Sequence, residues 1–260
     1  MSILRTLSVA FALAFAAPAF AQDVLRVGAY PANPPWEYKN ESGAFEGFEV
    51  DVVNEIAARL GTTAEFSGLD FRALFVAAAS RRVDMVISSL TITPERLQSQ
   101  SFTQPYVAGA LGIATKEGAG IASVEDLKGR RVGSIATSFP EIWVKEREAE
   151  LQLGSYSSYD STANMLTDLR SGRIEAAVND VVGLRHAMTQ IPGIAVAAEV
   201  PTDERFAIMM PKDSDLLPAV NDAISAMKTD GTMARLHEKW FGVAPAEGSL
   251  TLTPLPIPTE

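Results

Sequence analysis

One pattern occurs twice in the chain, first as Ser80-Arg81-Arg82-Val83-Asp84-Met85-Val86-Ile87-Ser88-Ser89 and again as Ser171-Gly172-Arg173-Ile174-Glu175-Ala176-Ala177-Val178-Asn179-Asp180. In each copy a segment of helical apolar periodicity, residues 71–79 or 163–169, leads through a basic turn into a short apolar run. This order is typical of a helix-to-strand step in a parallel sheet. Ser89 and Asp180 occupy the same repeat position, where each strand ends. The repeat therefore predicts two similar α/β halves.

A second echo lies earlier in each half, with Arg26-Val27-Gly28-Ala29-Tyr30 matching Arg131-Val132-Gly133-Ser134-Ile135. Each copy reads as a strand that runs into a polar loop. Open α/β sheets bind ligands outside the carboxyl ends of their strands. Two such halves that face each other would form a cleft with one wall from each. At 260 residues, 47% of them hydrophobic, the chain is long enough to bury two modest cores.

The apolar spacing of the other segments predicts the remaining strands and helices of the two halves. We expect strands at residues 24–30, 63–68, 106–115, 131–135, 155–159, 176–178, 194–198 and 206–210, and helices at residues 47–60, 141–151, 163–169 and 181–190, with a further helix beginning at Ser123. Two last helices, residues 216–228 and 232–240, should return to cover the first lobe. The expected division is lobe 1 at residues 22–110 and 206–242, lobe 2 at 111–205, and a proline-rich tail at 243–260.

The N-terminus predicts export through a cleaved signal peptide, residues 1–21. Arg5 supplies the positive region, residues 7–17 the apolar region, and Pro18-Ala19-Phe20-Ala21 a small-x-small cleavage site. The apolar region is shorter than the ~20 residues of a spanning helix. The chain has no cysteine, so it has neither a disulfide nor a lipidated thiol at the cleavage point. We expect a monomeric periplasmic protein.

Composition and motifs argue against several other classes. The formal charge of −10 disfavours a nucleic-acid or anionic-membrane partner. His186 and His237 are the chain's histidines, and we interpret both as surface or boundary residues; no histidine–carboxylate spacing resembles a zinc site. The sequence lacks Gly-x-Ser-x-Gly and Gly-x-Gly-x-x-Gly. We therefore predict no cofactor, no metal and no catalytic residue.

A fixed cation and a fixed anion stand out among the polar residues. The run Ser88-Ser89-Leu90-Thr91-Ile92-Thr93-Pro94-Glu95-Arg96 carries hydroxyls and a guanidinium, and Asp180 supplies a carboxylate. Bonds from such groups to a ligand carboxylate and ammonium contribute about 1.5–3 kcal/mol each. Taken alone, Arg96 reads as a surface charge and Asp180 as a helix N-cap. Their places in the repeat favour an α-amino acid head group bound between them.

Six short motifs carry a resemblance to a known family. They are Pro34-Pro35-Trp36-Glu37-Tyr38, Gly47-Phe48-Glu49-Val50-Asp51-Val52, Asp70-Phe71-Arg72-Ala73-Leu74, Ser89-Leu90-Thr91-Ile92-Thr93-Pro94-Glu95-Arg96, Glu125-Asp126-Leu127-Lys128-Gly129 and Lys239-Trp240-Phe241-Gly242. Over residues 24–242 the chain resembles the family 3 solute-binding proteins of amino-acid ABC transporters. The resemblance implies the two-lobed periplasmic binding protein fold (type II), an amino-acid ligand and membrane permease subunits as partners.

The same resemblance implies roles for individual residues. Arg96 and the backbone amide of Thr91 would hold the ligand α-carboxylate, together with the amides of Ser138 and Phe139 near a helix start. The remaining expected site residues are Ser89, Thr91 and Asp180 around the α-ammonium, Phe71 stacked on the ligand side chain, and Ser88 and Ile135 in the walls.

The chain departs from the family pattern where side-chain specificity is set. Relatives that bind basic amino acids resemble Asp-x-x-Tyr after the first strand, but this chain has Tyr30-Pro31-Ala32-Asn33. Phe139 and Pro140 also make the second wall more apolar. An unpaired buried charge is costly. We therefore expect a neutral ligand side chain, polar or aromatic, flanked by Tyr30, Asn33 and Phe71.

Two alternatives stay open at this point. An opine or an ectoine-like zwitterion also presents a carboxylate and a cationic nitrogen. A secreted cyclohexadienyl-type dehydratase is known on a similar fold, and it would use a carboxylic acid such as Asp180 as general acid.

Overall fold

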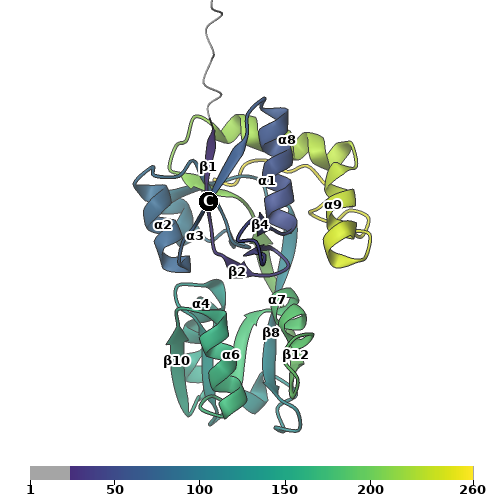
Figure 1. Cartoon of the computed structure of the whole chain (residues 1–260). Helices are drawn as coiled ribbons and strands as arrows, with labels where there is room; N and C mark the ends of the chain where they lie inside the picture. Colours follow the sequence, from purple (N-terminus) through teal and green to yellow (C-terminus); the bar gives the residue numbers. More distant parts are fainter. Residues whose placement is uncertain (1–23, 260) are drawn as a thin grey trace, which may run out of the picture.

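The structure, a computed structural model, describes residues 24–259, so the predicted signal peptide at residues 1–21 lies outside the described residues. Two α/β lobes lie one above the other, as predicted (Figure 1). Each lobe is built on a five-stranded sheet.

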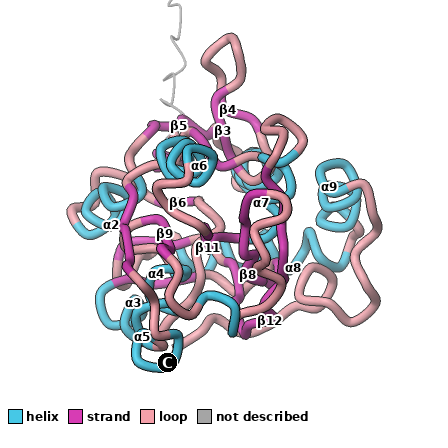
Figure 2. Tube along the Cα trace, turned by 90° about the horizontal axis from the view of Figure 1, so that it is seen from below, coloured by secondary structure: helices cyan, strands magenta, loops and turns pink. Residues whose placement is uncertain are grey.

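The first lobe contains a sheet of order β5-β1-β6-β13-β7. Strand β1 (Leu25–Ala29) pairs in parallel with β5 (Ala64–Gly68) and β6 (Met85–Ile87), whereas β13 (Met209–Pro211) is antiparallel to β6 and to β7 (Gln100–Phe102). Its helices are α1 (Phe48–Arg59), α2 (Phe71–Ala79), α3 (Pro94–Ser99), α8 (Leu217–Thr229) and α9 (Thr232–Phe241), and a small sheet comprises β2 (Ala32–Asn33), β3 (Glu37–Lys39) and β4 (Phe45–Glu46). Helices α2 and α3 lie on one side of the lobe and α8 and α9 on the other (Figures 1 and 2).

The second lobe has the sheet order β10-β9-β11-β8-β12. Its strands are β8 (Val107–Lys116), β9 (Arg131–Ile135), β10 (Ser155–Tyr159), β11 (Ala176–Asp180) and β12 (Ile194–Phe206). Its helices are α4 (Phe139–Glu146), α5 (Glu148–Leu151), α6 (Thr162–Ser171) and α7 (Val181–Met188), with one 3₁₀ turn η1 (Glu125–Leu127).

Four predicted elements differ from the structure by more than two residues. The strand expected at residues 206–210 is divided between the end of β12, at Phe206, and β13 (Met209–Pro211). The helix expected at residues 141–151 is two helices separated at Arg147, and it begins earlier because Ser138 caps α4 and Pro140 stands in its first turn. The helix expected from Ser123 is only the short turn η1. Strand β12 runs well beyond residues 194–198, because β8 pairs with it in antiparallel fashion from Ile194 to Pro201 and again at Arg205 and Phe206.

Two long strands join the lobes. The crossings expected near residues 109–112 and 202–205 fall inside β8 and β12, which pair with each other through Ala110 and Pro201 and through Val107 and Phe206. The register shifts between Pro201 and Arg205. Gly109 permits close packing here, since a Cβ at that position would lie 2.6 Å from the Phe206 ring.

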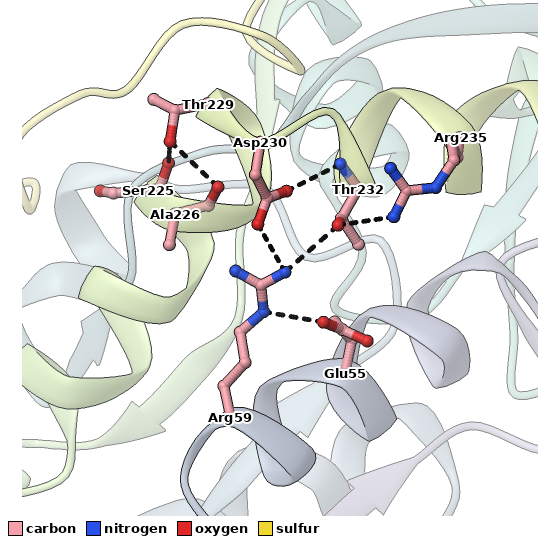
Figure 3. Close-up of polar contacts among 8 residues, drawn as sticks. All are labelled: Glu55, Arg59, Ser225, Ala226, Thr229, Asp230, Thr232 and Arg235. Atoms are coloured by element: carbon pink, nitrogen blue, oxygen red, sulfur yellow. Dashed lines mark hydrogen bonds and ion pairs between the residues drawn. The ribbon is translucent and has the colours of Figure 1, made fainter.

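The C-terminal helices return to the first lobe, as expected from their sequence. Trp240 Nε1 and Lys239 Nζ donate to Asp51 Oδ2 of α1 at 2.7 and 2.6 Å, and the Phe241 ring lies 5.1 Å from that of Phe48. Figure 3 shows a second junction, at which Arg59 of α1 reaches Glu55, Asp230 and Thr232 and so ties α1 to the turn between α8 and α9.

The proline-rich tail lies against the first lobe. Lys228 Nζ donates to Pro105 O at 2.6 Å and to Thr253 O at 3.0 Å, and Leu255 N donates to Gln104 Oε1 at 2.9 Å. Burial lowers the pKa of Lys228 to about 8. These bonds connect the tail to α8 and to the segment that precedes β8.

Candidate ligand-binding cleft

A cavity between the lobes contains every site residue predicted from the sequence. The predicted residues that line it are Tyr30, Asn33, Phe71, Ser88, Ser89, Thr91, Arg96, Ile135, Ser138, Phe139 and Asp180. The other lining residues are Pro140, Thr162, Asn179, Glu204 and Phe206.

The fold explains why these residues meet. Tyr30 follows β1 and Ser88 follows β6, and in the second lobe Ile135 and Asp180 end β9 and β11. The carboxyl ends of these parallel strands therefore point into the cleft from both lobes. Phe71 begins α2, and it packs against hydrophobic clusters of both lobes.

Arg96 is a buried cation. It lies in α3, whose N-cap Thr93 accepts from the Arg96 backbone N–H at 3.2 Å. Its Nη1 donates to Thr91 O at 2.7 Å, and its Nη2 crosses the cleft to Thr137 O at 3.0 Å. The guanidinium also lies 5.0 Å from the Phe75 ring centre.

No carboxylate among residues 24–259 contacts Arg96 directly as a salt bridge, although the charges of Glu204 and Glu95 act on it from a greater distance. Burial lowers the pKa of Arg96 to about 10, so the side chain remains charged at neutral pH. A buried charge without a counter-ion is costly. An anionic ligand group in this cavity would relieve that cost.

The two carboxylate oxygens of Asp180 differ in their hydrogen bonds. It is the N-cap of α7, and its Oδ2 accepts from Gly183 N at 2.6 Å and from Trp36 Nε1 at 2.9 Å. Its Oδ1 is buried and has no hydrogen-bond partner within the described part of the chain. Burial raises the pKa of this carboxyl group. The N-cap interpretation and the ligand-facing interpretation are therefore compatible, since an unpartnered buried acceptor favours a donor from a ligand.

Two buried carboxyl groups support the cavity wall in the first lobe. Glu37 Oε1 accepts from Ser88 Oγ at 2.8 Å, and Oε2 accepts from Asn33 Nδ2 at 3.3 Å. Glu49 accepts from Ser89 N at 2.9 and 3.1 Å and from the Tyr106 hydroxyl. Burial, followed by the neighbouring charge of Glu49, raises the pKa of Glu37 well above its usual range.

Ser89 is held in an unusual backbone conformation by this pair. Its φ of 43° lies in the left-handed region, which a residue with a Cβ enters at some cost. The two bonds from its N–H to Glu49 compensate that cost. The Ser89 Oγ, which accepts from Asn33 Nδ2 at 3.1 Å, is thereby fixed at the cavity.

Glu204 is a site residue that the sequence analysis missed. It lies in β12, is only 3% exposed, and accepts from Thr91 Oγ1 at 2.8 Å and from Thr202 Oγ1 at 3.3 Å. Burial raises its pKa to about 7. The available signal was period-two alternation, since Glu204 and the buried Phe206 lie on the same face of a strand.

The lobes also touch at the cavity. Besides the Trp36–Asp180 and Arg96–Thr137 bonds, the Tyr30 hydroxyl hydrogen-bonds with Thr162 at the start of α6. Trp36, which belongs to the first lobe, thus reaches the second lobe through this bond. The Trp36–Asp180 and Arg96–Thr137 bonds therefore join the two lobes across the cleft.

This architecture defines a two-lobed ligand-binding protein with a charged interlobe cleft. Residues 25–243 match the Bacterial extracellular solute-binding proteins, family 3, and the chain belongs to this family. The resemblance noted from the short motifs is confirmed.

Known relatives in this family bind amino acids. The chain is 33% identical over 223 residues to the L-cystine-binding protein TcyJ of Escherichia coli (strain K12), covering 84% of this chain and 82% of the relative. It is 31% identical to the histidine-binding periplasmic protein of the same strain, covering 91% and 94%. An ancestral arginine-binding protein bound to arginine is a structural neighbour, with a TM-score of 0.80, 35% identity, and coverage of 84% of this chain and 98% of that one.

The described residues contain neither a membrane-spanning helix nor a cluster of metal-binding side chains. Over residues 24–259 no helix combines the length and apolar character of a membrane span. Over the same residues no three histidine, aspartate or glutamate side chains are grouped so that they would hold a metal ion.

Proposed function

We propose that the protein captures an amino acid with a neutral side chain in the interlobe cleft and delivers it to the permease of an ABC transporter. The observation that carries the proposal is the pairing, in one cavity, of a buried guanidinium that forms no salt bridge with a described residue and a buried carboxylate with an unpartnered oxygen. These are the Arg96 and Asp180 side chains, which match the two charges of an α-amino acid. Relatives that bind cystine, histidine and arginine support the ligand class. Export to the periplasm follows from the signal peptide expected at residues 1–21.

The walls of the cavity support the neutral side chain. Tyr30, Phe71, Ile135 and Phe139 contribute aromatic and aliphatic surface. Among the lining residues in the described chain only Asp180 and Glu204 are acidic, and Glu204 already accepts from Thr91 and Thr202. A ligand guanidinium or ammonium among these walls would lack a dedicated partner, which is costly for a buried charge.

The first test is ligand selection. We expect a neutral amino acid, L-cystine included, to raise the melting temperature of the mature protein more than L-arginine, L-lysine or L-ornithine does. A ligand that binds only the folded state stabilises it by about 2.7 kcal/mol at a hundredfold excess over Kd. A thermal-shift screen followed by calorimetry measures this. If L-arginine binds tightest, the neutral assignment is wrong, and Glu204 becomes the first carboxylate to examine as its partner.

Capture by closure gives a second prediction. Arg96 and Asp180 lie in different lobes, and β8 and β12 are the paired connections between those lobes. A ligand that bridges the charges stabilises the closed form by its differential affinity for it. Small-angle scattering should therefore show a smaller radius of gyration at saturating ligand. Identical curves at demonstrated saturation would mean that the protein is closed without ligand.

The two alternatives are outcomes of the same experiments. Ectoine or an opine as the strongest binder in the thermal-shift screen would assign an amino-acid derivative. Turnover of prephenate-like acids by the purified protein would assign a dehydratase. Asp180 is poorly placed as general acid, because its Oδ2 caps α7 and already accepts from Gly183 and Trp36.

A further inference from the structure

Two hydroxyl groups of the cavity, those of Ser88 and Thr91, already donate hydrogen bonds to buried glutamates. Ser88 Oγ donates to Glu37 Oε1 at 2.8 Å, and Thr91 Oγ1 donates to Glu204 Oε1 at 2.8 Å. A hydroxyl group has one proton to donate and two lone pairs to accept with. Toward a ligand, each of these hydroxyls is therefore left as an acceptor.

The direction of both bonds is set by groups behind the cavity wall. Glu37 lies behind the wall beside Glu49, and its Oε1 accepts the Ser88 proton. An ionised Glu204 has no proton at all, so Thr91 must be the donor in their bond. Glu37 and Glu204 are nearly inaccessible to solvent, at 0% and 3% exposed, so water does not compete for their bonds to Ser88 and Thr91.

A third acceptor in the same cavity is Asp180 Oδ1, which has no partner within residues 24–259. With Ser88 Oγ and Thr91 Oγ1 it makes three acceptors that offer no proton, and a primary ammonium offers three N–H donors. A methylated or cyclic ammonium offers fewer. It would leave a buried acceptor unpaired, and such a loss discriminates strongly between ligands.

We propose that Glu37 and Glu204, which do not themselves have to touch the ligand, are positioning residues that make the cleft selective for a primary ammonium by fixing Ser88 and Thr91 as acceptors. The inference rests on the proposed amino-acid binding and narrows its ligand class. It disfavours betaine-like and ectoine-like nitrogens at this site.

The test compares one ligand pair across four proteins at about pH 8, at which Glu204 is ionised. The probes are the common L-amino acid, L-cystine included, that binds the parent tightest in calorimetry, and the Nα-methyl form of that same amino acid. The proteins are the parent, Glu204→Met, Glu204→Gln and the matched control Glu199→Met, which alters an exposed glutamate of the same strand. The readout is the ratio of the two Kd values.

We expect the parent to prefer the primary amine by about thirtyfold or more, as the loss of one buried hydrogen bond implies. Glu204→Met removes the acceptor, frees the Thr91 proton and should reduce this ratio about tenfold. Glu204→Gln keeps an oxygen for Thr91 and should restore most of the ratio, and Glu199→Met should leave it unchanged.

Three outcomes would overturn the inference. They are tolerance of Nα-methylation by the parent, an unchanged ratio in folded Glu204→Met, and a ratio in Glu204→Gln as low as in the methionine variant. If Glu204→Met does not fold, Thr91→Val removes the hydroxyl that Glu204 holds, with little change in shape, and the ratio must fall there instead. Failure of every amino acid to bind the parent is a different result, because it contradicts the proposed function itself.

Discussion

Replacement of Arg96 by alanine should weaken amino-acid binding by about 1.5–3 kcal/mol or more, which is roughly 10- to 150-fold in Kd. The guanidinium is the buried cation of the cavity, and its loss leaves the ligand carboxylate without a charged partner. Asp180→Ala should have a similar effect on the ammonium side, and it also removes the N-cap of α7 and the acceptor for Trp36. Asp180→Asn keeps an oxygen for those two structural bonds, while its amide NH2 replaces the ligand-facing oxygen, so it tests the ligand-facing acceptor with the N-cap retained.

Arg26→Ala is the matched control for the arginine variant. Arg26 is an exposed residue that pairs with Asp84 at 2.6 Å, away from the residues that line the cavity. Exposed pairs of this kind contribute little, so ligand affinity should stay within error of the parent. Calorimetry with the tightest-binding amino acid measures both variants. Unchanged affinity in folded Arg96→Ala would contradict the zwitterion assignment.

The second large effect concerns stability rather than binding. Glu204→Gln should be more stable than the parent at about pH 8, by about 3 kcal/mol. Burial raises the pKa of Glu204 to about 7 in the folded protein, whereas the unfolded chain has a pKa near the usual value of about 4.3. Between these values the unfolded chain releases a proton that the folded protein keeps. The free energy of unfolding of the parent therefore falls as the pH rises through this window, and glutamine does not titrate.

Urea unfolding of parent and variant across the range from about pH 4 to pH 8 measures this difference. The two proteins should be equally stable at the acid end and should diverge toward pH 7. Glu199→Gln, an exposed change in the same strand, should show no divergence. A constant offset at every pH would mean that the Glu204 bonds, and not its ionisation, set the difference. Residues at functional sites commonly lower the stability of the folded protein, as we expect for ionised Glu204.

The charged pair of the cleft was predictable because it lies at element ends that the sequence marks clearly. Ser89 and Asp180 follow two apolar runs of one repeat, and strand ends of parallel sheets gather at one edge. Glu204 was not predictable in this way. Its run, Thr202-Asp203-Glu204-Arg205, is polar throughout and reads as a connection, yet it forms part of β12 because β8 supplies hydrogen bonds beside it. There Glu204 is buried, and it accepts from Thr91 of the first lobe.

The predicted bounds of a helix agree with the structure only where the apolar spacing belongs to one uninterrupted helix. Helix α2 was predicted at its observed bounds because its apolar spacing coincides with a single helix, Phe71–Ala79. The segment after Pro140 also has helical spacing, but the chain breaks at Arg147 and turns at Gln152, whose φ of 46° is left-handed. Apolar spacing does not report such a break, because Leu151 packs into the same core as Val144 on either side of it. The tail was predicted as extended, but its bonds to Lys228 and Gln104 depend on tertiary structure alone.

The bond between Trp36 and Asp180 makes Trp36 an intrinsic fluorescence probe of the cleft. Trp36 Nε1 lies in the first lobe and donates across the cleft, whereas Trp143 packs in the core of the second lobe and Trp240 donates to Asp51 within the first. If the lobes separate, Trp36 is the one of these three tryptophans whose indole N–H loses a buried carboxylate as its hydrogen-bond partner and donates to water instead. In a background with phenylalanine at positions 143 and 240, the emission of Trp36 should follow the opening and closing of the cleft directly, without any attached dye.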